Sequence, residues 1–222
     1  MALAQMQRQL QSLYDVSLEH SVEDYLVTDR AFLDAVSRES RGRDTPERLL
    51  FAESGGELLV SLYLDRELVD GLATSDPYTR LDAANLKEFC TALEGVSHFV
   101  YLLFNATYER PVSRLELELQ AEVDKFFAVW MLSATQGRAL DVESLSDWLF
   151  DRCRFDPALG HGERDRYETA NRLARAFCKR LHEVLESDGG EVSLYPELRR
   201  FYRMRHFEKI GSAMHGAAMR AP

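Results

Sequence analysis

Apolar residues recur at three- and four-residue steps along two neighbouring segments of the chain, residues 82–106 and 113–132. This spacing places them on one face of an α-helix. Both segments also carry apolar residues on their other sides, which is typical of helices buried in the middle of a domain. The second segment opens with Ser113 and Glu116 at the spacing of a capping box. We therefore predict a central antiparallel helix pair.

A β-hairpin is predicted ahead of this pair. Apolar residues alternate along residues 57–65, and Ser54-Gly55-Gly56 separates this run from a first strand at 48–53. Further helical patterns cover residues 1–14, 21–37, 66–73, 142–153, 163–186 and 196–210. We expect a mainly α fold with one β-hairpin at 48–65, in which about seven or eight helices surround the central pair. The pattern predicts a single globular domain over residues 1–210, with a peripheral first helix and a flexible tail at 211–222.

Composition narrows the class of protein. The 222 residues include 27 Lys and Arg against 37 Asp and Glu, a net charge of −10, which argues against a general nucleic-acid binder. No signal-peptide pattern and no apolar run long enough to span a membrane is visible. Cys90, Cys153 and Cys178 form no CxxC pair, which indicates buried, reduced thiols in a cytoplasmic protein.

Ionisable residues sit beside the apolar faces of both central helices. Glu94 and His98 are one turn apart on the first helix, and Glu118 and Glu122 are one turn apart on the second. We expect these four side chains to approach a common interior, where one histidine and two carboxylates could bind Zn, Mn or Fe. The alternative is purely structural: Glu94 forms a hydrogen-bonded pair with His98, and Glu118 or Glu122 pairs with a group such as Lys125 across the interface between the helices.

The order of these elements resembles the core of zincin metallopeptidases of the gluzincin type, in which a hairpin precedes a helix with an HExxH motif and a later helix supplies a glutamate. Here the helix carries Glu94-Gly95-Val96-Ser97-His98 and the later one Glu118-Leu119-Gln120-Ala121-Glu122. The resemblance implies that His98 matches the second histidine and Glu118 the third ligand. Glu94 replaces the first histidine, and Gly95 replaces the glutamate that acts as general base. The resemblance therefore implies a decayed peptidase core that lacks a catalytic residue.

The predicted last helix has a different character. Residues 196–210 carry five basic residues against Glu197 and Glu208, a net charge of +3 in an acidic protein. As a docking surface for an acidic partner, RNA or membrane headgroups, this helix would use Arg199, Arg200, Tyr202, Arg203, Arg205, Phe207 and Lys209. Alternatively, the arginines pair with the chain's own carboxylates while the apolar residues pack inward.

These observations favour a non-catalytic interaction or adaptor protein that needs no cofactor and binds a protein partner through its last helix. Binding of nucleic acid is expected at most through that helix. The alternative function is a metal-dependent hydrolase, or another metalloenzyme, that binds one divalent metal at Glu94, His98 and Glu118. A third alternative is a homo-oligomer in which the last helix docks on a neighbouring copy.

Overall fold

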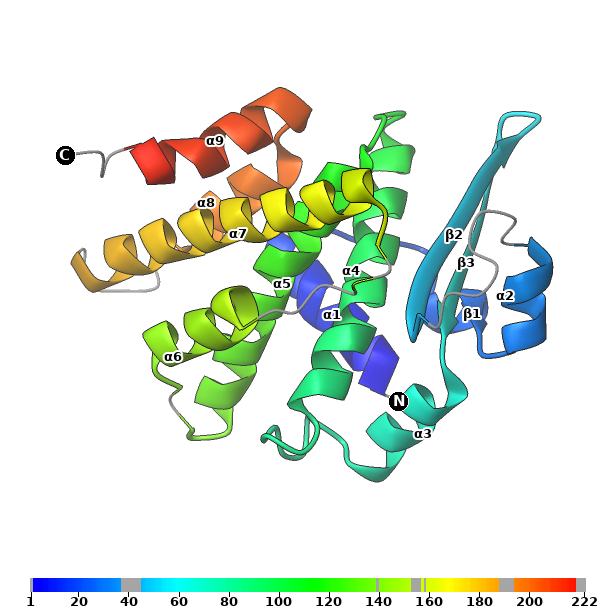
Figure 1. Ribbon diagram of the computed structural model, residues 1–222, viewed down its shortest axis with the longest axis horizontal. Coiled ribbons are helices and arrows are strands. Elements are labelled where there is room, and N and C mark those ends of the chain that lie inside the picture. Colours follow the sequence, from blue (N-terminus) through cyan, green and yellow to red (C-terminus); the bar gives the residue numbers. More distant parts are fainter. Residues whose placement is uncertain are drawn as a thin grey trace.

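The computed structural model describes residues 2–36, 45–138, 140–152, 157, 159–187 and 194–218. Helices α4 (Leu86–Thr107) and α5 (Arg114–Thr135) pack against each other at the centre. The capping box at Ser113 and Glu116 is present as predicted. In Figure 1 a small sheet lies on one side of α4, while α7, α8 and α9 lie on the other side of the pair. The predicted mainly α fold with a β-hairpin is confirmed.

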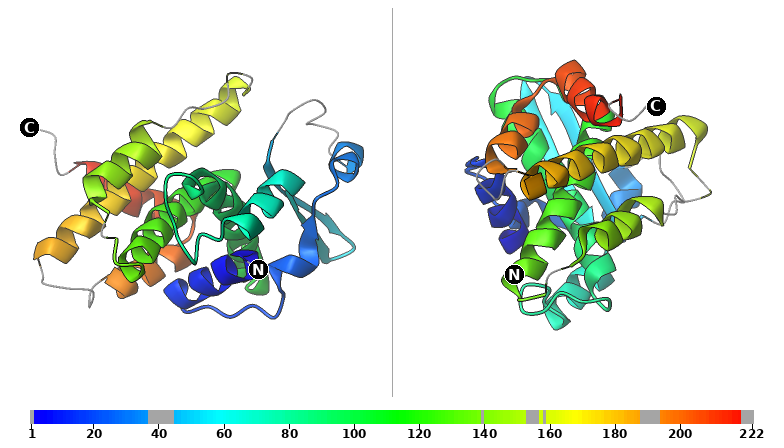
Figure 2. Two further views of the ribbon diagram at one scale, coloured as in Figure 1. Left: turned by 90° about the horizontal axis from the view of Figure 1, so that it is seen from below. Right: turned by 90° about the vertical axis from the view of Figure 1, so that its left-hand side faces the viewer.

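The remaining elements surround this pair. They are α1 (Ala2–Tyr14), a 3-10 turn (Val22–Tyr25), β1 (Leu26–Val27), α2 (Arg30–Val36), β2 (Glu47–Ser54), β3 (Glu57–Leu64), α3 (Arg66–Thr74), α6 (Val142–Ser146), a π-helical turn (Asp147–Asp151), α7 (His161–Ser187), α8 (Leu194–Arg203) and α9 (His206–Ala218). Helix α1 packs against α4, and α7 packs against α5. They cover opposite sides of the central pair (Figure 2). No helix among the described residues is long and apolar enough to cross a membrane.

The predicted hairpin is present, and a third strand extends it. Strands β2 and β3 are antiparallel, and Gly55 and Gly56 form a two-residue turn with positive φ, at 62° and 85°. Strand β1 pairs with β3 in parallel, so the sheet order is β1-β3-β2. The prediction of one helix over residues 21–37 is therefore wrong. Ser21 caps only a short 3-10 turn, because pairing with β3 holds Leu26 in the extended conformation.

Helix α1 is part of the core rather than peripheral. Met6 and Tyr14 are fully buried, and Leu10 nearly so. The prediction was wrong because glutamines on this helix have buried partners. Gln7 donates to the His20 carbonyl and accepts from the Val22 amide, so the polar side chain is satisfied inside.

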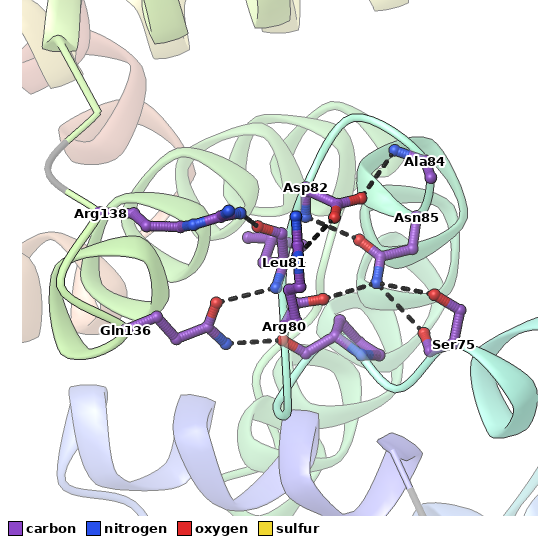
Figure 3. A network of polar contacts seen from close by, with 9 residues as sticks. Ser75, Arg80, Leu81, Asp82, Ala84, Asn85, Gln136 and Arg138 are labelled. Atoms are coloured by element: carbon purple, nitrogen blue, oxygen red, sulfur yellow. Dashed lines mark hydrogen bonds and ion pairs between the residues drawn. The ribbon is translucent and has the colours of Figure 1, made fainter.

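The predicted helix cap at Asp82 lies three residues too early, since Asn85 is the N-cap of α4. The Asp82 carboxylate accepts a hydrogen bond from the Ala84 amide, and Asn85 donates to the Ser75 and Arg80 carbonyls (Figure 3). The Gln136 side chain, just after α5, bonds the Leu81 amide and the Pro77 carbonyl. These contacts fold the segment before α4 against the end of α5, so the helix begins at Leu86.

The last predicted helix is two helices. Helix α8 ends at Arg203, and the Glu208 carboxylate accepts from the Arg205 amide at the start of α9. Helix α9 continues to Ala218, so residues 211–218 are helical where the pattern predicts a tail. The thiol of Cys153 lies outside the described residues. Cys90 and Cys178 are buried free thiols, as predicted.

A buried hydrogen-bond network links α1, α4, α5 and α9. The Asp124 carboxylate accepts from Tyr14 Oη, from Ser97 Oγ at 2.6 Å and from Gln120 Nε2 at 2.7 Å. Lys209 of α9 is fully buried, and its Nζ donates to Gln120 Oε1 at 2.6 Å. A lysine can be buried in this way only when its ammonium group finds acceptors inside the protein.

Aromatic groups complete the environment of Lys209. Its Nζ donates to Tyr101 Oη at 3.1 Å and to the Phe201 carbonyl at 3.3 Å. It also lies 4.3 Å from the ring centroid of Tyr101 and 4.6 Å from that of Phe201, within cation–π range. Burial lowers the pKa of Lys209 to about 7, although the Asp124 and Glu116 charges favour its ammonium form.

This shift predicts a pH-dependent stability. Lysine in the unfolded chain titrates near pH 10.5, so between about pH 7 and 10 the unfolded state binds more protons than the folded state. Lys209 should therefore contribute a rise in the free energy of unfolding with pH in this window, of at most about 1.4 kcal/mol per pH unit. His98, Cys90 and Cys178, whose pKa values are raised, contribute with the opposite sign, so the effect of Lys209 is the difference in slope between the wild-type protein and a variant without it. Of the groups facing Lys209, Asp124 has its pKa raised to about 6 by burial, and burial raises the pKa values of Tyr101 and Tyr202 above 10, outside the window.

The variant Lys209→Met should lose this rise, because methionine keeps most of the buried volume and has no titratable group. Urea unfolding of both proteins at several pH values between 7 and 10 measures the two slopes. Equal slopes would show that Lys209 does not titrate differently in the folded and unfolded states.

Candidate metal centre

The structure brings together three of the predicted site residues. Glu94, His98 and Glu118 each offer a ligand atom, and these three atoms lie within 4.8 Å of one another. Glu94 and His98 lie one turn apart on α4, and Glu118 comes from the facing helix α5. His98 Nε2 lies 3.6 Å from Glu118 Oε2. The predicted convergence of the two helices' polar side chains at these three positions is confirmed.

The cluster is buried, with one partly open side. His98 is 7% exposed and Glu118 is 9% exposed, while the Glu94 side chain is 25% exposed. Burial alone would lower the pKa of His98, but the Glu118 and Glu47 carboxylates raise it well above its usual value. The surroundings of this imidazole therefore favour a positive charge.

Glu122 lies beside the cluster but is bound differently. Lys125 Nζ donates to Glu122 Oε1 at 2.7 Å and to Glu94 Oε2 at 3.0 Å, so the lysine bridges the two carboxylates. Burial raises the pKa of Glu94, but the Lys125 and His98 charges outweigh it and hold this pKa below its usual value. The predicted pairing of Glu122 with Lys125 is present, but it lies within α5 at an i,i+3 spacing rather than across the interface between the two helices. Glu94 pairs with Lys125 and lies close to His98.

Sequence reasoning missed Glu47 and Arg166. Glu47 Oε1, at the start of β2, lies 3.5 Å from His98 Nδ1, and Arg166 Nε, on α7, lies 3.7 Å from Glu118 Oε1. Neither contact follows from helical or strand periodicity, because each joins elements that are distant in the sequence. A signal for Glu47 did exist: a glycine inside a long buried helix often marks the close approach of another segment.

That glycine is Gly95. A Cβ atom at this position would lie 2.8 Å from Glu47 Cγ and 2.8 Å from Leu62 Cδ1. These distances are below normal van der Waals contact, so the sheet packs on α4 where this residue has no side chain. The gluzincin resemblance assigns a glutamate to position 95, but the space that its side chain would need is taken by Glu47 of β2 and Leu62 of β3.

The charges of the cluster do not balance. Glu47, Glu94, Glu118 and Glu122 bring four carboxylates against the fixed cations Lys125 and Arg166, and even a protonated His98 leaves one carboxylate in excess. In addition, His98 Nε2, Glu47 Oε1 and Glu122 Oε2 are buried and have no hydrogen-bond partner among the described residues. Buried polar atoms without partners are rare, and a bound ion is one of the recognised reasons for them.

In comparisons with known proteins, no family model, no curated protein and no solved structure matches the chain. Two surface pockets, of about 810 and 730 Å³, lie elsewhere. The first lies between the hairpin turn and the end of α4, and the second is lined by α5, α6 and α7. The interpretation of the cluster therefore depends on its own geometry.

The predicted docking residues of the C-terminal helices separate into two groups. Tyr202 and Lys209 are buried, at 1% and 0% exposure, so they cannot contact a partner. This part of the docking prediction is wrong, because α8 and α9 pack into the core through these side chains. Phe207 is 87% exposed, and Arg205 is exposed beside it.

Arginines of α8 bind to the end of α1. Arg199 Nε donates to the Leu13 carbonyl at 3.3 Å, and Arg203 Nη2 donates to the Asp15 carbonyl at 2.8 Å. Carbonyls at a helix C-terminus have no partner within the helix, and a cation there also opposes the helix dipole. Arg200 forms an ion pair with Glu197 at 2.7 Å. The Arg200–Glu197 pair, and an Arg199–Asp15 pair at 3.9 Å, fit the alternative in which the arginines pair with the chain's own carboxylates, whereas Arg203 binds backbone carbonyls.

The close packing at Gly95 gives a matched pair of variants. Gly95→Ala should destabilise the protein by about 1–3 kcal/mol, since the new methyl group must displace Glu47 and Leu62. The control is Gly71→Ala on α3, where a Cβ would meet nothing within 4 Å. That control should be neutral or stabilising by up to about 1 kcal/mol, because alanine favours helix more than glycine does. Equal thermal stability of the two variants would contradict the packing described here.

Proposed function

We propose that this protein binds one divalent transition-metal ion through Glu94, His98 and Glu118. The observation that carries the proposal is His98 Nε2, a buried ring nitrogen with no hydrogen-bond partner among the described residues. It faces the Glu118 carboxylate at 3.6 Å, and a Glu94 oxygen completes a group of three ligand atoms within 4.8 Å of one another. A single ion between such atoms can accept an electron pair from each of them.

Charge and ligand type support the same proposal. A divalent cation would neutralise the excess of carboxylates over the cations Lys125 and Arg166. One imidazole and two carboxylates suit Zn, Mn or Fe. Three protein ligands are also typical of catalytic zinc sites, which keep a further position for water or substrate.

We propose metal-dependent hydrolysis as the class of reaction. When bound, such a metal supplies Lewis-acid chemistry and a water of lowered pKa. The chain's own residues hold the ligands in place: Lys125 fixes Glu94 and Glu122, and Arg166 lies against Glu118. The side at Glu94, the most exposed of the three proposed ligands, is where a substrate would approach. We further propose a cytoplasmic location, supported by the buried free thiols of Cys90 and Cys178.

Metal analysis tests this proposal directly. Purified protein, loaded with Zn, Mn or Fe and then desalted, should retain about one equivalent of metal per chain. His98→Ala and Glu118→Gln should retain much less, because each removes one of three ligands. Metal should also raise the melting temperature of the wild-type protein, since it binds the folded state.

The control variant is His161→Ala, which removes an exposed histidine at the start of α7. It should keep the full metal content. Absence of stoichiometric metal from the wild-type protein, with each of the three metals, would refute the proposed function.

A second candidate function is association through α9. Phe207 and Met214 lie two turns apart on this helix, at 87% and 49% exposure. Large contiguous apolar patches mark protein-binding surfaces, and these two side chains could form part of one on this helix. The partner that the chain itself offers is a second copy, in which these faces pack together.

This candidate is tested by a point variant. Deleting α8 and α9 would remove the buried side chains of Leu198 and Phe201 and expose the core that they pack against. We therefore expect a truncated protein to unfold. Phe207→Ser should instead leave the melting temperature unchanged and convert a concentration-dependent dimer to a monomer in light scattering. A wild-type protein that is monomeric at every concentration would refute this candidate.

A further inference from the structure

We infer that Glu47 is a positioning residue of the metal centre: its carboxylate accepts the Nδ1–H of His98 and so directs Nε2 of the same ring towards the metal. The inference rests on the proposed metal-binding function and adds a residue from the sheet to a centre otherwise built from α4 and α5.

The geometry places one carboxylate at each nitrogen of the ring. Glu47 Oε1 lies 3.5 Å from Nδ1, and Glu118 Oε2 lies 3.6 Å from Nε2. The Glu47 side chain is 12% exposed, and its Oε1 atom has no hydrogen-bond partner among the described residues. Both distances are slightly longer than a hydrogen bond, so a small rotation of the ring or of the carboxylate would close the Nδ1 contact.

The fold brings Glu47 to this position through two local features. Glu47 pairs with Leu64 at the end of the sheet that lies over α4. Gly95 then leaves space for the Glu47 side chain, because a Cβ there would lie 2.8 Å from Glu47 Cγ. The missing side chain at position 95 therefore admits a carboxylate from another element, which reaches the histidine one turn further along α4.

The chemistry of metal-bound histidine explains what this carboxylate does. An imidazole that binds a metal through one nitrogen commonly donates the N–H of the other nitrogen to a carboxylate. This contact fixes the tautomer, orients the ring and makes the ligand nitrogen more basic. Removing such a partner typically weakens metal binding about 10- to 100-fold.

The test compares Glu47→Gln with Glu53→Gln, an exposed glutamate on the same strand. Zn affinity is measured by competition with a chromophoric chelator, and the melting temperature is measured without metal. Glu47→Gln should bind Zn about 10- to 100-fold more weakly than the wild-type protein. Its metal-free melting temperature should change little, because the amide has the same shape, its oxygen can still accept from the His98 Nδ1–H, and Glu118 still faces the other ring nitrogen. Glu53→Gln should match the wild-type protein in both measurements.

Nitrogen-15 spectra report which nitrogen of the His98 ring carries the proton and which binds metal. These signals would not change if Glu47 only stabilised the fold. In the Zn-loaded wild-type protein, His98, assigned by comparison with His98→Ala, should show a protonated Nδ1 and a metal-bound Nε2. In Glu47→Gln the Nδ1–H signal should shift or broaden through faster exchange. Equal Zn affinity in the two proteins, or a loss of affinity matched by a loss of metal-free stability, would overturn the inference. Failure of the wild-type protein to bind Zn, Mn or Fe would instead refute the proposed function.

Discussion

The burial of charged side chains along α5 is the constraint on which the rest of the structure depends. Four charged residues of this central helix are each at most 9% exposed: Glu116, Glu118, Asp124 and Lys125. An uncompensated buried charge is strongly destabilising, by about 3–5 kcal/mol when one partner of a buried pair is removed. Each charge must therefore find a partner on another element. Those partners come from α1, α4, α7 and α9, so satisfying α5 also fixes the positions of its neighbours.

The partners differ on the two sides of α5. Asp124 accepts three hydrogen bonds from Tyr14, Ser97 and Gln120, so its charge is well satisfied by the protein itself. Among the described residues, Glu118 forms longer ion pairs, of 3.6 and 3.7 Å, with His98 and Arg166. The first side resembles a structural network that holds helices together. The second has carboxylates in excess and unpartnered buried atoms, which is the condition expected of a site for a cation.

Sequence patterns were sufficient for the features that local chemistry determines. The apolar periodicity of residues 86–107 and 114–135 predicts the central helices, and Gly55-Gly56 predicts the hairpin turn. The same periodicity predicts that Glu94, His98 and Glu118 share an interior, since each position on a helix face is fixed by its spacing. Nothing in the sequence tests whether these residues bind a metal, and the gluzincin resemblance remains a prediction.

Features that depend on contacts between distant elements were not predictable in this way. Strand β1 forms only because β3 is beside it, and Glu47 reaches His98 only because the sheet packs on Gly95. Lys209 is the clearest case. A basic, aromatic helix has the same pattern whether its lysine faces solvent or enters the core, and only the acceptors on α4, α5 and α8 determine which occurs.

The position of Lys209 also affects how the chain can fold during synthesis. This residue lies 89 positions after Gln120, its acceptor on α5. Until α9 has emerged from the ribosome, the Gln120 oxygen and the Tyr101 hydroxyl lack the ammonium donor that they bind in the finished structure. The central helices can form early from local contacts, but their packed interior is completed only after the last helix arrives. A nascent chain lacking α9 would therefore expose core surface that this helix covers in the finished structure.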